Sequence, residues 1–248
     1  MKHDHHRTTE EDGVSNPWRD MQEGDGWRMY LGDSVELLPT FSVGTFNAVV
    51  TDPPYGINTK SDGEGKLNPW ADLCNAALWY SIWIREARRA LTADGCLWSF
   101  LNWRSMVTFQ KAACDIKWPI ESLLVWDKQW IGPGGSRGLR PSYEMVALWS
   151  GPEFSIEDRG LPDIQRFQWS SFKPSGHPAE KPTELCKWLI QQSGATRVLD
   201  PFAGSGTTGI AALETGAMFT GIEIDEHWFR VACNRLRSAT PCLFGAKT

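Results

Sequence analysis

The chain has 248 residues, 41% of them hydrophobic and 22% charged, with a formal net charge of −5 at pH 7. This composition is ordinary for a soluble globular protein and predicts one large domain with a substantial core. The six cysteines form no CxxC pair, and no apolar run approaches membrane-spanning length. We therefore expect a cytoplasmic protein with reduced thiols, no membrane segment and no metal site.

The first 26 residues differ in composition from the rest of the chain. They carry three Lys or Arg against seven Asp or Glu, a difference of −4 out of the total of −5. With few apolar positions, residues 1–26 are predicted to form a mobile acidic arm. The remainder is nearly neutral, and the stretch from Lys128 to Tyr143 contains basic residues but no acidic one. The overall negative charge therefore does not exclude a nucleic-acid partner.

Strand and helix patterns alternate after the arm. In chain order they predict a strand at 27–31, a short helix capped by Ser34, a strand at 46–51, a helix at 71–91, a strand at 96–101, a helix at 105–114, strands at 121–126 and 142–150, a helix at 183–193, a strand at 197–200, a helix at 207–215, a strand at 218–223 and a helix at 226–237. This order predicts a single α/β domain over 27–240 with a mostly parallel, doubly wound, Rossmann-like sheet. The short link between 121–126 and 142–150 suggests an antiparallel edge pair.

Asp52-Pro53-Pro54-Tyr55 follows directly after the buried strand 46–51. Tandem prolines remove two backbone donors and fix φ, so the carbonyls of Asp52 and Pro53 are expected to stay free of the sheet. A carboxylate and a carbonyl held together are two acceptors for one exocyclic amine, and Tyr55 adds an aromatic face. Two such acceptors favour a tetrahedral nitrogen with a usable lone pair, which predicts transfer to an aromatic amine. Taken alone, the residues also fit a plain Pro-Pro turn.

A second motif, Asp200-Pro201-Phe202-Ala203-Gly204-Ser205-Gly206-Thr207-Thr208, connects a strand to a helix. Its glycines permit a tight turn and a close approach of a ligand to the backbone, and the helix start offers unpaired N–H groups. Glu223 ends the next strand, where a carboxylate can accept both hydroxyls of a ribose. The motif therefore predicts a cofactor that contains adenosine.

Together the two motifs resemble those of the S-adenosylmethionine-dependent amino-methyltransferases of DNA, which act on adenine N6 or cytosine N4. Because the tetrapeptide precedes the glycine motif, the order resembles that of the circularly permuted β group. The resemblance implies that Asp52 and the Pro53 carbonyl polarise the amine, Pro54 shapes the turn and Tyr55 stacks on a base flipped out of double-stranded DNA. It implies cofactor contacts for Asp33, Lys181, Thr183, Asp200, Phe202, Gly204, Ser205, Gly206, Thr207 and Glu223.

The resemblance also divides the domain into a catalytic half (27–150), a target-recognition segment (151–176) and a cofactor half (177–240). It places Trp126-Asp127-Lys128 and Ser142-Tyr143-Glu144 near the flipped base. The recognition segment is short for reading several base pairs, so the loops 56–69 and 131–140, or a partner copy in a homodimer, could share the work. DNA contacts are predicted for Lys128, Arg137, Arg140 and Arg166.

Among the amino-methyltransferases that the chain resembles, Asp rather than Ser at position 52 favours adenine N6, at a specific short sequence, over cytosine N4. Cytosine N4 stays open, as do methylation of RNA or of a protein amide and an inactive nucleic-acid-binding partner subunit. Protein-glutamine methylators carry Asn first and the cofactor motif ahead of the tetrapeptide, unlike this chain. An inactive subunit would be expected to show decay in one of the motifs, and neither motif does.

Overall fold

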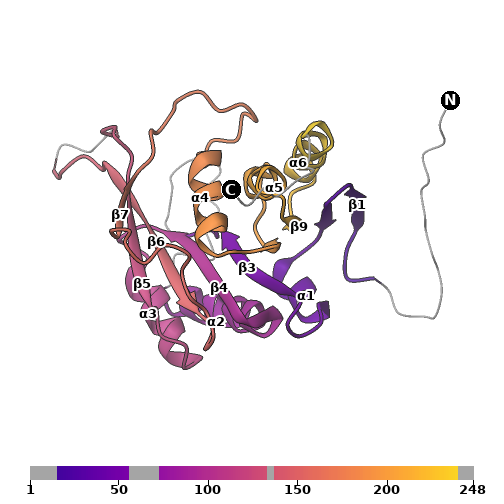
Figure 1. The fold of residues 1–248 in the computed structure, drawn as a ribbon, viewed down its shortest axis with the longest axis horizontal. Helices are drawn as coiled ribbons and strands as arrows, with labels where there is room; N and C mark the ends of the chain where they lie inside the picture. Colours follow the sequence, from indigo (N-terminus) through magenta and orange to yellow (C-terminus); the bar gives the residue numbers. More distant parts are fainter. Residues whose placement is uncertain (1–15, 56–72, 133–136, 240–248) are drawn as a thin grey trace.

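The computed structural model describes residues 16–55, 73–132 and 137–239, and in them a nine-stranded sheet carries helices on both faces (Figure 1). The strands are β1 (Asp20–Gly24), β2 (Trp27–Leu31), β3 (Phe46–Thr51), β4 (Leu91–Leu101), β5 (Ser122–Asp127), β6 (Tyr143–Ser150), β7 (Ile164–Arg166), β8 (Arg197–Asp200) and β9 (Met218–Glu223). The helices are α1 (Ser34–Leu37), the 3-10 turn η1 (Leu38–Thr40), α2 (Leu73–Ala90), α3 (Met106–Asp115), α4 (Thr183–Gln192), α5 (Thr207–Glu214) and α6 (Glu226–Ser238).

The strand order is β1-β2-β9-β8-β3-β4-β6-β5-β7. From β2 to β4 every neighbouring pair is parallel, while β6 runs antiparallel to both β4 and β5. The chain leaves β3 toward β4 on one side and leaves β8 toward β9 on the other, so the order of the strands reverses between β3 and β8. In a doubly wound sheet, such a switch point opens a crevice at the carboxyl ends of the strands.

Two apolar clusters hold the helices against the sheet. In β3, Ala48 and Val50 pack with α4, α5 and α6 on one face, whereas Val49 packs with α2 and α3 on the other. This alternation follows from the two-residue period of a strand. Both faces of the central strands are buried, which is typical of parallel sheets. Figure 1 shows α4, α5 and α6 together on one side of the sheet and α1, α2 and α3 on the other.

The structure confirms the doubly wound α/β fold and corrects several details. The predicted arm is wrong at its C-terminal end, because Asp20–Gly24 forms β1 and pairs antiparallel with β2; residues 1–15 lie outside the described residues. The predicted antiparallel pair is present as β5 and β6, but it is not the edge of the sheet, since β7 lies beyond β5. The three-residue strand β7 lies in a polar, Pro-containing stretch for which no strand was predicted.

Two local predictions near the site also change. Asp33, not Ser34, caps α1, since its carboxylate accepts from the Val35 N–H at 2.8 Å. The Ser34 hydroxyl instead donates to the Pro201 carbonyl at 2.5 Å, which ties the β2–α1 connection to the glycine motif. In addition, β4 begins at Leu91, immediately after α2, rather than at the predicted residue 96.

Candidate active site

The two sequence motifs meet at the switch point of the sheet. Thr51 ends β3 and Asp200 ends β8, and the Thr51 hydroxyl donates to Oδ1 of Asp200 at 2.6 Å across 149 positions of sequence. Both side chains are buried. The Phe202 N–H also donates to this oxygen, at 3.0 Å, so that one carboxylate sets the path of both loops. Asp200 therefore positions the two motifs, and its predicted direct contact with a cofactor stays a prediction.

Two hydrogen-bond donors hold the Asp52 carboxylate of the tetrapeptide. The Tyr55 hydroxyl donates to Oδ1 of Asp52, and the Lys181 ammonium donates to Oδ2. The Tyr80 hydroxyl, from α2, donates to the Pro54 carbonyl at 2.6 Å and so fixes the turn from outside the motif. Among the described residues, no hydrogen bond uses the Pro53 carbonyl. The Pro53 carbonyl thus has no donor in the described part of the chain, and its predicted contact with an amine stays a prediction.

A chain of alternating charges runs from Asp52 into the neighbouring strands. Lys181 Nζ lies 3.6 Å from Oε2 of Glu144, and Lys128 Nζ lies 2.5 Å from Oε1 of the same residue. The Lys181 side chain is only 10% exposed. Although burial raises the pKa of Glu144, the two ammonium groups hold it below its ordinary value. Burial lowers the pKa of Lys181, but Asp52 and Glu144 together raise it above its ordinary value. Both groups therefore stay charged at neutral pH.

The phenol of Tyr55 stays protonated as well. Burial raises its pKa well above 10, and the charges of Asp52 and Glu144 add to this effect. The Tyr55 ring is half-buried and packs against both apolar clusters. The structure thus fixes one edge of the ring through its hydroxyl, and the predicted stacking of a base on its face stays a prediction.

The glycine motif has the backbone geometry that close ligand approach requires. Gly204 and Gly206 have φ values of +52° and +82°, which a residue with a Cβ rarely adopts. Gly206 is the N-cap of α5, so the helix begins with its N–H groups directed toward the turn. A Cβ on Gly204 would have only the His177 ring near it, at 3.7 Å, so the space over this peptide is open on that side. The Phe202 ring packs against Trp79 and Trp83 of α2, and its predicted contact with a cofactor stays a prediction.

Glu223 closes the glycine turn from β9. Its Oε2 accepts from the Gly204 N–H at 2.7 Å, and its Oε1 accepts from the Asp225 N–H at 2.8 Å. Burial raises the pKa of Glu223 even though these amides lower it. Each oxygen of a carboxylate can accept a second hydrogen bond. Asp33 lies at the same edge of the sheet, because the Gly32 N–H donates to the Glu223 carbonyl at 2.9 Å.

A buried ion pair that the sequence analysis missed braces the glycine motif. Arg235 of α6 donates through Nη2 to Oε1 of Glu180 at 3.0 Å and through Nη1 to the Ser205 carbonyl at 2.7 Å. Its Nη1 also lies 3.1 Å from the Ser205 hydroxyl and 3.3 Å from the Thr207 hydroxyl. The Glu180 side chain is 4% exposed. Ser205 and Thr207, which were predicted to contact a cofactor, therefore contact Arg235 in this structure. Thr183, for which a cofactor contact was also predicted, is the first residue of α4.

The four residues predicted to bind DNA divide into two groups. Lys128 is 12% exposed and paired with Glu144, which leaves little of it for phosphate contact. Arg137, Arg140 and Arg166 are exposed. Arg140 donates to the carbonyls of Gly132 and Ile131, at 2.8 and 3.2 Å, and Arg166 lies 3.3 Å from the Asp127 carboxylate.

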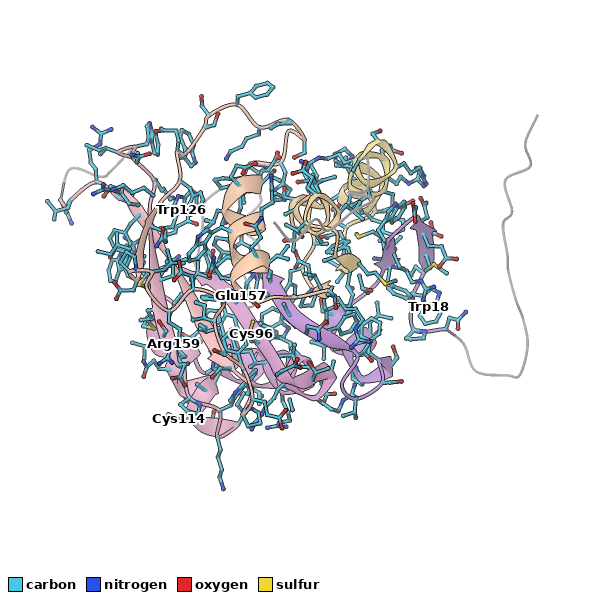
Figure 2. The ribbon with its side chains drawn as sticks, in the orientation of Figure 1. Trp18, Cys96, Cys114, Trp126, Glu157 and Arg159 are labelled. Atoms are coloured by element: carbon cyan, nitrogen blue, oxygen red, sulfur yellow. The ribbon has the colours of Figure 1, made fainter. Side chains whose placement is uncertain are left out.

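The predicted recognition segment is partly built into the fold. Ile164–Arg166 adds β7 to the sheet beside β5, and the Glu157 N–H donates to the Gln192 carbonyl at the end of α4. Figure 2 labels Glu157 where this stretch crosses the sheet. Trp169 stacks on Trp130 with ring centroids 4.0 Å apart, and the Lys173 ammonium lies over the Trp169 ring. Part of the segment is therefore built into the sheet, and its predicted role in reading DNA stays a prediction.

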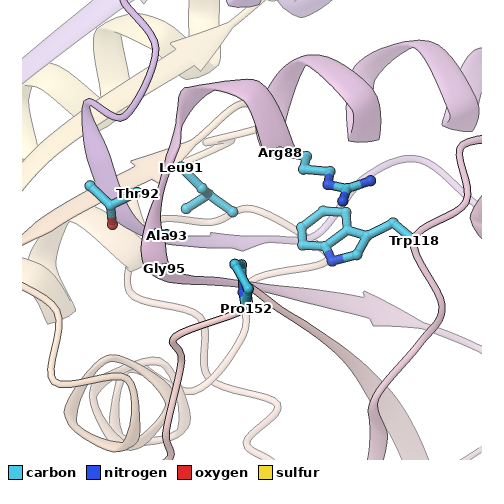
Figure 3. Close-up of a pocket in the computed structure, with 8 residues that line it drawn as sticks. Arg88, Leu91, Thr92, Ala93, Gly95, Trp118 and Pro152 are labelled. Carbon is cyan, nitrogen blue, oxygen red and sulfur yellow. The ribbon is translucent and has the colours of Figure 1, made fainter.

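Other features of the described residues do not compete for the catalytic role. A pocket lined by Arg88, Leu91, Trp118 and Pro152 lies where β4 begins (Figure 3). Because β3 and β4 are parallel, this pocket lies at the amino ends of the strands, whereas Asp52 follows the carboxyl end of β3. In the described part of the chain there is no group of three His, Cys, Asp or Glu that could hold a metal ion. No helix there is long and apolar enough to cross a membrane. Cys96, labelled in Figure 2, is a buried free thiol.

A doubly wound sheet with a glycine turn and an Asp-Pro-Pro-Tyr loop joined at its switch point defines the Rossmann-like class of amino-methyltransferases. Residues 46–234 match the family model described as DNA methylase, of the N6/N4 methyltransferase type. The chain belongs to this DNA methylase family.

Individual relatives match most of the chain. YubD of Escherichia coli (strain K12), which carries the name of a methylase, is 29% identical over 218 residues, covering 84% of this chain and 89% of YubD. The crystal structure of M1.HpyAVI in complex with SAM has a TM-score of 0.66 at 21% identity, over 85% of this chain and 98% of that one. The cytosine-N4-specific DNA methyltransferase PvuII has a TM-score of 0.69 at 18% identity, over 89% of each chain.

Proposed function

We propose that this protein transfers a methyl group from S-adenosylmethionine to the N6 amine of adenine in double-stranded DNA, at a specific short sequence. The observation that carries the proposal is the Thr51–Asp200 hydrogen bond, which fixes the amine-binding loop and the glycine turn side by side at the switch point. Membership of the DNA methylase family supports the reaction class. M1.HpyAVI, a protein of the same fold, binds SAM.

The residues at the glycine turn fit S-adenosylmethionine. The positive φ values of Gly204 and Gly206 let a ligand approach the backbone, and the Glu223 carboxylate has acceptor capacity left for ribose hydroxyls. We expect Asp33, two residues after the end of β2, to contact the adenine ring. When bound, the cofactor supplies an electrophilic methyl group on a sulfonium.

The chain's own residues orient and activate the amine. The Asp52 carboxylate and the Pro53 carbonyl would each accept one N–H of the target amine, which draws its nitrogen toward a tetrahedral geometry. Tyr80 and the two prolines keep this pair of acceptors rigid, so little reorganisation is needed when charge develops on the nitrogen. A base can reach Asp52 only outside the helical stack, which requires it to be flipped from the duplex.

The choice of adenine rests on Asp at the first position of the tetrapeptide. Cytosine N4 is the second candidate, because PvuII, a cytosine-N4-specific enzyme, has the same fold over 89% of this chain. In both bases the amine is conjugated with a ring nitrogen, so the two acceptors act in the same way on either. The chemistry at the amine therefore allows either base, and the preference for adenine rests only on the resemblance that Asp at this position carries.

Expression in a host without DNA methylation, followed by single-molecule sequencing of the host DNA, tests the proposal. We expect N6-methyladenine at one short sequence motif and none in cells that carry an empty vector. N4-methylcytosine instead would shift the assignment to the second candidate. An unmodified genome, with the protein folded and present, would contradict both.

A further inference from the structure

Asp52, the residue that should receive the target amine, is already occupied by a cation. Its Oδ2 accepts from Lys181 while its Oδ1 accepts from Tyr55. An ammonium on this carboxylate neutralises the charge that would polarise the amine. It also opposes the positive charge that develops on the amine nitrogen during methyl transfer. The contact between Lys181 and Asp52 therefore suits the protein without a target base and hinders the reaction itself.

Glu144 offers Lys181 a second place to bind. Oε1 of Glu144 is taken by Lys128 at 2.5 Å, whereas Oε2 is a buried atom without a hydrogen-bond partner among the described residues. Lys181 Nζ already lies 3.6 Å from this oxygen. A buried acceptor that lacks a donor is costly, so a small movement of the ammonium would satisfy it.

The surrounding backbone indicates which partner moves. Glu144 lies in β6, paired with Trp126 of β5, and is fixed in the sheet. Asp52 follows β3 directly, and its turn is fixed by Tyr80. Lys181 lies in the connection before α4, at the end of a long flexible side chain. Rotation of that side chain alone can exchange one carboxylate for the other.

The charges balance in both arrangements. Two carboxylates, Asp52 and Glu144, share the site with two ammonium groups, Lys128 and Lys181, so a movement of Lys181 leaves the net charge at zero. With Lys181 on Asp52, each carboxylate has one cation. With Lys181 on Glu144, both cations lie on Glu144, and the free negative charge is on Asp52, where the amine nitrogen becomes positive.

We propose that Lys181 is a positioning residue with two settings: it caps Asp52 in the absence of a target base and transfers to Oε2 of Glu144 when the target amine binds. This inference rests on the proposed methyl transfer. It assigns Glu144 a role as the acceptor that draws Lys181 away from Asp52. No proton is transferred and no bond to carbon changes in this step.

Three variants test the two settings: Glu144→Gln, Lys181→Met and the double variant. A neutral amide at position 144 attracts the ammonium far less than a carboxylate does, so Glu144→Gln leaves Lys181 on Asp52 and should lower kcat at least about tenfold. S-adenosylmethionine affinity should change less than about twofold, because Glu144 lies outside the proposed cofactor contacts. Lys181→Met removes the competing cation, so the double variant should be several-fold more active than Glu144→Gln alone.

The measurements are the steady-state kcat on unmethylated genomic DNA, the cofactor Kd by calorimetry, and the melting temperature of each variant. Asp115→Asn on α3 is the matched control, since it breaks an exposed pair with Lys111 and should leave kcat unchanged. If Glu144→Gln retains the wild-type kcat, or if the double variant is no more active than Glu144→Gln, the two-setting account is wrong although the enzyme methylates DNA. A wild-type protein that transfers no methyl group overturns the proposed function, and this inference with it.

Discussion

Glu223 is the single residue on which cofactor affinity should depend most directly. Its carboxylate joins the Gly204 and Asp225 amides and is the proposed acceptor for the ribose hydroxyls. Glu223→Gln keeps the size but removes the charge, and loss of charge-assisted hydrogen bonds should weaken S-adenosylmethionine binding about ten- to a hundredfold. Calorimetry measures this Kd. Glu226→Gln, in an exposed pair with Arg230, is the control, and equal Kd values for the two variants would contradict the assignment.

Asp200 should give the protein a pH-dependent stability. Burial raises its pKa to about 6 from 3.8, although hydrogen bonds from Thr51, Thr208 and Phe202 lower it. The folded state therefore binds more protons than the unfolded state between these values. The free energy of unfolding accordingly falls as pH rises through that window, by roughly 3 kcal/mol in total.

Asp200→Asn removes this titration. Urea unfolding at pH 4 and at pH 8 should show that the wild type loses roughly 2–3 kcal/mol relative to Asp200→Asn between the two values. A difference between the two proteins that does not change with pH would show that the carboxyl group titrates normally in the fold.

At the scale of elements, the connection of α6 to the glycine turn depends on Arg235. Arg235→Met leaves Glu180 buried without its cation, which should reduce the free energy of unfolding by about 3–5 kcal/mol. Adding Glu180→Gln should recover part of this loss, because the uncompensated charge is then gone. Chemical denaturation gives both values.

The exposed pair of Arg230 and Glu226, with side chains 70% and 58% exposed, supplies the comparison on the same helix. Arg230→Met should cost less than about 1 kcal/mol. If Arg235→Met costs no more than Arg230→Met, the buried pair does not brace the glycine turn.

The elements around the two motifs could be predicted because their patterns are strong. Strands 27–31, 46–51, 197–200 and 218–223 have the predicted bounds, since each is a short apolar run that ends at Gly, Pro or an acid. The strand β7 could not be predicted, because three residues with exposed Ile164 give no periodic signal. Its pairing with β5 is a tertiary effect.

Only the residues of the candidate site that belong to the two sequence motifs could be predicted from the sequence. Asp52, Gly204 and Glu223 stand in recognisable local sequence, whereas Tyr80 and Arg235 reach the site from the faces of helices. On a helix, such residues resemble ordinary packing or surface positions until the fold brings them together. The position of Lys181 between Asp52 and Glu144 depends on three separate elements, so it could not be predicted from the sequence, and the cofactor contact predicted for Lys181 stays a prediction.

At the scale of the whole molecule, the exposed arginines beside the site should supply the electrostatic part of DNA binding. Arg137 is exposed and Lys128 is not, so Arg137→Ala should lower the slope of log K against log salt by about 0.9, and Lys128→Ala by clearly less. Fluorescence anisotropy with a labelled duplex at several KCl concentrations measures the slope.

Arg28→Ala is the matched control, because Arg28 pairs with Glu23 near the start of β2, at the opposite edge of the sheet. A larger effect for Arg28 than for Arg137 would place the DNA on another face. The recognition segment is short and partly folded onto the sheet. We therefore propose that a second copy of the chain, in a homodimer, contributes side chains that read the DNA sequence.

The central claim is that the Asp52 carboxylate activates an amine of a DNA base for methyl transfer. Purified wild type and Asp52→Ala should be incubated with DNA and S-adenosylmethionine labelled in its methyl group, and the nucleosides then identified by mass spectrometry. We predict labelled N6-methyladenine with the wild type and at least about a hundredfold less with Asp52→Ala, which should still bind the cofactor. Full labelling by Asp52→Ala would contradict the account.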